Sequence, residues 1–130
     1  MILLDTHVVL WVTSDPARLS AKAKATIEET RKNGDGLAIC DITLLELATL
    51  ANKGRINLSI SLESLLRELE ERFTVLPISS RACARTMELP SSYSKDPADR
   101  IIGATALVEG LTLLTADREI RRSRVVPTTW

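Results

Sequence analysis

Short apolar runs, separated by longer segments of helical periodicity, are the feature that most constrains the fold of this chain. Each run holds three or four residues and is bounded by a turn or a charged side chain. The runs are Ile2 to Asp5, Leu37 to Cys40, Phe73 to Leu76, Leu111 to Leu114 and Arg124 to Val126. Continuous apolarity is typical of parallel strands that are covered on both faces. We therefore expect a central parallel sheet of about five strands.

The segments between these runs predict helices. Ser20 caps the helix that ends at Lys32, and Asp96 caps Pro97 to Glu109, which has proline at its first position and Gly110 just past its end. The other predicted helices are Ile42 to Asn52, Ser61 to Glu71, Ser79 to Glu88 and the short Arg118 to Arg121, with Pro90 to Lys95 as a loop. This alternation predicts an α/β fold with the sheet between helical layers and right-handed crossovers.

Length and composition limit the class of protein. With 130 residues the chain is expected to form one domain, residues 1–130, and a core that is 3% aromatic must be aliphatic. The 17 basic and 17 acidic residues cancel, so any polyanion must bind a local patch. We expect Cys40 and Cys83 to be reduced core residues. No apolar run approaches the roughly 18 residues that span a bilayer, and no leader is recognised, so a cytoplasmic location is expected.

Four acids occupy similar structural boundaries. Asp5 and Asp117 follow apolar runs, whereas Glu46 and Asp99 lie near the starts of predicted helices. Open α/β sheets bind ligands beyond the carboxyl ends of their strands, so these four acids are expected to share one cleft. Simple structural roles compete with this interpretation: Glu46 could complete a capping box with Thr43, Asp99 could favour the helix dipole, and Asp117 could cap a helix. Asp5 is harder to explain, because a buried unpaired charge is costly.

Four converging carboxylates would repel each other and favour a bound cation. Oxygen ligands suit Mg²⁺, or Mn²⁺ in its place, whereas zinc is disfavoured because His7 is the single histidine and the cysteines lack ligand spacing. Metal-bound carboxylates commonly serve phosphoryl chemistry. The chain has no phosphate-binding glycine loop, no second aspartate two residues after Asp5, and no evident nucleophilic serine or cysteine.

The four acids lie in segments that resemble the ordered motifs of the PIN-domain ribonucleases, and within them the VapC-like toxins of type II toxin–antitoxin pairs. The segments are Met1-Ile2-Leu3-Leu4-Asp5-Thr6-His7, Leu44-Leu45-Glu46-Leu47, Asp96-Pro97-Ala98-Asp99-Arg100-Ile101-Ile102 and Leu114-Thr115-Ala116-Asp117. The resemblance runs almost end to end. His7 stands where many members have Asn, which together with Leu10-Trp11 is similar to a DTH-type subgroup.

The resemblance implies a PIN-like fold and metal-dependent hydrolysis of RNA phosphodiester bonds. Asp5, Glu46, Asp99 and Asp117 carry over as catalytic, metal-binding acids, and Thr6 and Thr115 as supporting hydroxyls. The basic segment after Asp117 is a candidate RNA-binding rim, although each of its arginines could equally belong to a solvated face. These arginines are Arg118, Arg121, Arg122 and Arg124. Arg100 could instead pair with a carboxylate.

The expected partners are RNA, a cognate VapB-like antitoxin and a second copy of the chain, with no membrane. An amphipathic antitoxin helix could dock between Ile42 to Asn52 and Ser61 to Glu71, although those leucines could equally be core. Two alternatives remain at this point: a catalytically silent PIN-like interaction module, and a phosphatase or receiver-like protein. The aromatic residues Trp11, Phe73, Tyr93 and Trp130 are few, and the sequence nominates none of them as a reader of RNA bases.

Overall fold

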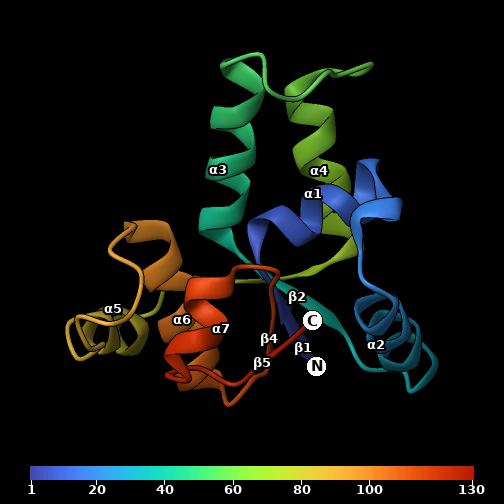
Figure 1. Cartoon of the computed structure of the whole chain (residues 1–130). Helices are drawn as coiled ribbons and strands as arrows, with labels where there is room; N and C mark the ends of the chain where they lie inside the picture. The colour runs from blue at the N-terminus through green and yellow to red at the C-terminus, as the bar shows by residue number, and fades with distance from the viewer.

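The computed structural model describes residues 1–130 and contains one parallel sheet. Its five strands run in the order β3-β2-β1-β4-β5, and every neighbouring pair is parallel (Figure 1). The strands are β1 (Ile2–Leu4), β2 (Leu37–Cys40), β3 (Thr74–Leu76), β4 (Leu113–Leu114) and β5 (Thr128–Thr129). The predicted parallel sheet of about five strands is therefore confirmed.

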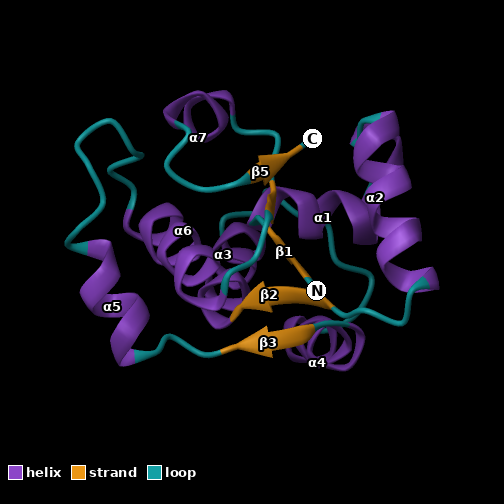
Figure 2. Ribbon diagram, turned by 90° about the horizontal axis from the view of Figure 1, so that it is seen from below, coloured by secondary structure: helices purple, strands orange, loops and turns teal.

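Helices cover both faces of the sheet (Figure 2). They are α1 (Thr6–Ser14), α2 (Ala21–Lys32), α3 (Asp41–Asn52), α4 (Leu62–Arg72), α5 (Ser80–Thr86), α6 (Pro97–Glu109) and α7 (Arg118–Ser123), with a short 3₁₀ turn, η1 (Pro16–Arg18). Ser20, Ser61 and Asp96 accept backbone N–H bonds at the starts of α2, α4 and α6. Gly110 ends α6 with φ of 65°, a conformation that glycine adopts without strain.

Alternate residues of β1, β2 and β4 enter two separate apolar clusters, as the pleat of a strand requires. On β1, Leu4 belongs to the cluster beneath α1, α2, α3 and α4, whereas Leu3 belongs to the cluster beneath α6 and α7. On β2, Ile39 and Cys40 divide in the same way. Both clusters are almost wholly aliphatic. The two faces of the central strands are thus buried, which explains why their sequences carry no polar residue.

Two expectations about the chain need correction. The last strand is β5, not Arg124 to Val126, because Arg124 ends α7 in the left-handed region with φ of 55° and Val126 packs into the core. The extended pairing begins only at Pro127, whose carbonyl accepts a bond from Leu113. Cys40 is buried as expected, but Cys83 is exposed on α5. None of the helices is long and apolar enough to cross a membrane.

Candidate active site

The amino ends of α1, α3, α6 and α7 gather at the carboxyl edge of the sheet (Figure 1). Asp5 caps α1 directly after β1, and Asp117 caps α7 three residues after β4. Glu46 lies in the second turn of α3 and Asp99 in the first turn of α6. Since β1 and β4 are hydrogen-bonded neighbours, the four acids named from the sequence belong to one edge. The partial positive charge of the helix ends favours anionic side chains there.

Asp5 is only 6% exposed, and its two carboxylate oxygens have separate partners. Oδ1 accepts the backbone N–H of Thr6 at 2.8 Å, and Oδ2 accepts the Thr115 hydroxyl at 2.7 Å. Thr115 lies beside Asp5 because the Asp5 backbone N–H bonds to Leu114 on the neighbouring strand. Thr115, which the family resemblance named as a supporting residue, thus donates a hydrogen bond directly to Asp5, the most buried of the four acids.

Glu46 is connected to the same part of the edge through Thr6. The Thr6 hydroxyl donates to Glu46 Oε1 at 2.5 Å and lies 3.0 Å from the hydroxyl of Thr43, which is fully buried. The capping-box alternative for Glu46 is wrong, because α3 starts at Asp41 and Glu46 is its sixth residue. Thr6 therefore connects Glu46 through its hydroxyl and Asp5 through its backbone N–H. Thr43, which the sequence did not single out, belongs to the same hydrogen-bond network.

Asp99 depends on a residue that the sequence did not reveal, Ser94. The Ser94 hydroxyl donates to Asp99 Oδ2 at 2.7 Å and accepts the N–H of Asp96 at 3.2 Å. Asp96 in turn accepts the N–H of Asp99 as the cap of α6, as the sequence predicted. The signal for Ser94 is local: a serine two residues before a helix-capping aspartate commonly bonds to the backbone ahead of it.

The segment that carries Ser94 is fixed against α6 by two side chains. Arg100 donates to the carbonyls of Thr86, Leu89 and Ser94 at 3.0–3.1 Å, so the expectation that it could pair with a carboxylate is wrong. Tyr93 is 2% exposed and packs over Gly103, where a Cβ would lie 2.3 Å from the Tyr93 hydroxyl. Only glycine fits at position 103. The close packing of Tyr93 on α6 therefore fixes the position of its chain neighbour, Ser94.

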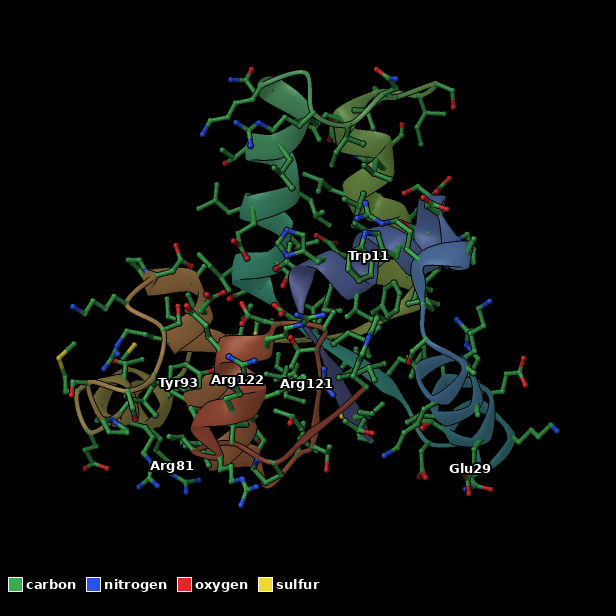
Figure 3. The ribbon with its side chains drawn as sticks, in the orientation of Figure 1. Trp11, Glu29, Arg81, Tyr93, Arg121 and Arg122 are labelled. Carbon is green, nitrogen blue, oxygen red and sulfur yellow. The ribbon has the colours of Figure 1, made fainter.

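Asp117 has two roles at the edge. Its Oδ1 accepts the N–H of Ile120, so the capping role is real, and its own N–H bonds to the Thr115 hydroxyl. The arginines that follow are exposed and enclose a hollow of about 380 Å³ with no apolar lining. The hollow is lined by Arg118, Arg121, Arg122 and Arg124. Figure 3 shows Arg121 and Arg122 on the side of α7 that faces the viewer.

Burial and mutual repulsion destabilise the charged forms of three of the acids. Burial raises the pKa of Asp5, partly offset by the bonds from Thr115 and Thr6. Burial likewise raises the pKa of Glu46, against the bond from Thr6. Burial raises the pKa of Asp99 to about 6, with contributions from the charges of Asp5, Asp96 and Asp117. No ion pair relieves this, since the two ion pairs of the structure, Arg67–Glu63 and Arg85–Glu88, lie on exposed helix faces. The charge of His7 lowers the pKa of Asp5 and Glu46 only in part.

The acids share an edge, but they do not form a preassembled metal site. No group of three or more His, Cys, Asp or Glu side chains is close enough together in this structure to hold one ion, and binding of a metal by the four acids stays a prediction. Asp5, Glu46 and Asp99 each accept a hydrogen bond from a hydroxyl group instead. The available metal ligands are nevertheless all carboxylate oxygens, the type of ligand that Mg²⁺ and Mn²⁺ prefer.

Comparison with known proteins assigns the chain to a family. The PIN domain model matches residues 2–125. This chain belongs to the PIN-domain family. It is also 42% identical, over 123 residues, to ribonuclease VapC22 of Mycobacterium tuberculosis, a match that covers 95% of this chain and 92% of that protein. The chain is therefore a homologue of a VapC ribonuclease.

Solved structures support the PIN fold. VapBC2 of Rickettsia felis, solved with a promoter DNA fragment, gives a TM-score of 0.75 at 21% identity and covers 100% of this chain and 99% of that one. A toxin–antitoxin complex of Klebsiella pneumoniae gives 0.70 at 23%, covering 100% and 97%. DNA-bound VapBC of Salmonella typhimurium gives 0.69 at 24%, covering 99% and 98%. At these identities the likeness concerns the fold, and all three cover nearly the whole PIN domain.

Proposed function

We propose that this PIN-domain protein is a metal-dependent ribonuclease toxin that hydrolyses RNA phosphodiester bonds. The observation that carries the proposal is the carboxyl edge, where three acids have raised pKa values and form no ion pair. A folded protein keeps such a costly arrangement when a cation completes it. The homology to ribonuclease VapC22 supports RNA as the substrate.

Asp5, Glu46, Asp99 and Asp117 are the residues that would hold Mg²⁺ or Mn²⁺. When bound, the ion supplies hydroxide from water and polarises the scissile phosphate. The protein's own part is to orient the acids: Thr115 holds Asp5, Thr6 holds Glu46, and Ser94 holds Asp99. Supporting contacts of this kind typically matter about 10–100-fold in metal affinity or activity.

The arginine-lined hollow on α7 is the proposed contact for the RNA backbone. Arg118, Arg121 and Arg122 are exposed and make no ion pair, so their charges are free for phosphates. They follow Asp117 within one short helix, which sets the basic surface beside the acids. The exposed arginines would position the strand without reading its sequence.

An antitoxin is the proposed inhibitor, and its docking place is a groove between α1, α3 and α4. The groove has a volume of about 190 Å³, and 7 of its 13 lining residues are apolar. Leu47 and Leu69 among them are buried in the core, whereas Leu65 is partly exposed. Ile60, which is 42% exposed, extends the apolar surface at its margin. An amphipathic helix with apolar residues at helical spacing would suit such a groove. We further propose that the protein forms a homodimer. We also propose that it belongs to the DTH-type subgroup, because Asp5-Thr6-His7 and Trp11 match that pattern.

Cleavage of single-stranded RNA by purified protein tests the function. We expect cleavage with MgCl₂ or MnCl₂, none after chelation, and recovery when the metal is restored. Activity that persists in excess chelator would overturn the proposal. Protein purified under denaturing conditions and refolded, together with an Asp5→Asn preparation handled in parallel, controls for a contaminating nuclease.

A catalytically silent PIN-like interaction module is the second candidate, and one observation favours it: no three acids are assembled around one point. Calorimetric titration with MnCl₂ separates the two functions. The ribonuclease predicts stoichiometric binding that Asp99→Asn weakens, whereas the silent module predicts no saturable heat in either protein.

A further inference from the structure

A small hollow lined by both acids and aromatic rings lies beside the proposed catalytic edge. Its volume is about 200 Å³, and its lining consists of Asp5, His7, Trp11, Ala116 and Asp117. A cavity of about 150 Å³ accommodates benzene in an engineered protein, so this hollow has room for one flat ring system. The acids at its wall belong to the site proposed above, whereas the rings have no part in that chemistry.

The aromatic residues of the chain differ sharply in accessibility. Phe73 and Tyr93 are 5% and 2% exposed and belong to the two cores. Trp11 and Trp130 are only partly buried, and their ring centroids lie 5.7 Å apart at a tilt of 56°. Of these two, only Trp11 lines the hollow. The structure therefore leaves Trp11 as the aromatic surface that a ligand at the carboxyl edge meets.

Trp11 is held in place before any ligand arrives. The guanidinium of Arg18 lies 4.7 Å from the centre of the indole ring, and Trp130 packs against it from the carboxyl terminus. His7, one helical turn earlier on the same face of α1, lies 6.2 Å away by ring centroids. A ring fixed in this way loses little conformational freedom on binding, which favours stacking.

We propose that Trp11, flanked by His7, forms a stacking site for one unpaired nucleobase of the RNA next to the scissile phosphate. Bases in single-stranded RNA are commonly recognised by stacking on aromatic side chains. The proposal rests on the proposed ribonuclease function.

The location agrees with the proposed path of the RNA backbone. In Figure 1, α1 lies in front of α4 and α7 in front of α6, and Figure 3 shows Trp11, Arg121 and Arg122 on that same side. Asp117 lines the aromatic hollow and caps the helix that bears the arginines. A strand whose phosphates follow α7 would thus bring a base to Trp11 as it passes the acids.

The test combines RNA substrates that lack one base with protein variants that lack the Trp11 ring. Oligoribonucleotides with a single abasic residue, placed in turn at each position around the cleaved bond, are compared in the wild type, Trp11→Leu and Trp11→Phe. Leucine keeps an apolar side chain but lacks a π face, whereas phenylalanine keeps both. We expect one abasic position to lower kcat/KM of the wild type by roughly 5- to 100-fold, the range of base–aromatic stacking.

At that position the same abasic residue should have little effect in Trp11→Leu, and its effect should largely return in Trp11→Phe. Equal abasic effects in the wild type and Trp11→Leu at every position would overturn the stacking site while leaving the ribonuclease function intact. Thermal melting of both variants verifies that they are folded, and Trp11→Phe retains a stacking ring if leucine destabilises the protein.

A binding measurement keeps the two proposals separable. In a Trp130→Phe background Trp11 is the single tryptophan, and its fluorescence in EDTA reports binding of the oligoribonucleotide, because the proposed hydrolysis requires the metal. Quenching by the intact strand and loss of quenching with the abasic strand support the site even if no cleavage is found. Equal quenching by both strands, or none by either, would overturn it even if cleavage is robust.

Discussion

The carboxyl edge and the α7 surface meet at Asp117 and carry opposite charges, and the side chains of the two regions have different partners. At the edge, Asp5 and Asp99 are withdrawn from solvent and bonded to Thr115 and Ser94. On α7, Arg121 and Arg122 are exposed and unpaired. Buried or half-buried acids that form no ion pair favour a bound cation, whereas free exposed arginines suit a polyanion. A net charge of zero therefore hides two charged regions with different ligands.

The largest effect is expected from Asp5→Asn. Asparagine keeps the helix cap but removes the negative charge, so cleavage should fall by at least about 100-fold, the upper end of what a supporting residue contributes. Initial rates on a fluorescent RNA measure this. Glu63→Gln, which changes an acid that is 77% exposed on α4, should keep wild-type activity. A similar loss in this variant would mean that the effect is not specific to the acids of the carboxyl edge.

Replacing the free arginines should give the next largest effect. Arg118→Ala combined with Arg121→Ala and Arg122→Ala is expected to weaken RNA binding about 10-fold or more at low salt. The slope of log affinity against log salt should fall by about 2, because each phosphate contact on a single strand contributes about 0.7.

Fluorescence anisotropy in EDTA over a salt series measures this slope. Arg67→Ala is the matched control, since that arginine is already paired with Glu63. An unchanged salt slope in the triple variant would show that the RNA passes elsewhere.

Loss of the Ser94 hydroxyl should give a smaller effect that depends on pH. Its hydrogen bond lowers the pKa of Asp99, so Ser94→Ala should raise that pKa further and leave more of the carboxyl protonated in acid. Cleavage should fall about 10-fold near pH 6 and only a few-fold near pH 8. Ser92→Ala, in the same loop but exposed, should keep the wild-type pH profile. A loss that does not vary with pH would mean that Ser94 only supports the loop.

The smallest effect is expected on the stability of the metal-free protein. The pKa of Asp99 is raised from 3.8 to about 6. The protonated carboxyl therefore stabilises the fold below 3.8, and this contribution is lost as the pH rises through about 6. Because Asn cannot ionise, Asp99→Asn should melt about 2–6 °C higher than the wild type at pH 8 in EDTA, and at the same temperature at pH 4.

Scanning calorimetry measures both melting temperatures. Adding MnCl₂ should reverse the order at pH 8, because only the wild type gains from the ion. A wild type that is already the more stable protein in EDTA would mean that Asp99 is not strained by its neighbours.

Local sequence was a good guide wherever one element decides the outcome. Asp96 caps α6, and Gly110 ends it, because both features follow from backbone groups within a few residues. The buried Leu3 and Leu4 of β1 follow from uninterrupted apolarity. Predictions failed where distant residues compete: Glu46 bonds to Thr6 from another helix instead of capping its own.

The sequence by itself determined the parallel sheet, the helix ends and the four ordered acids, since strand burial and helix capping are local and periodic properties. Only the tertiary structure decided how the acids are held, because hydrogen-bond partners such as Ser94 and Thr115 are chosen by packing. The same holds for Trp11, whose ring lines a hollow only because α1 lies beside Ala116 and Asp117, which follow β4. Contacts between residues far apart in the chain carry no signature in their spacing.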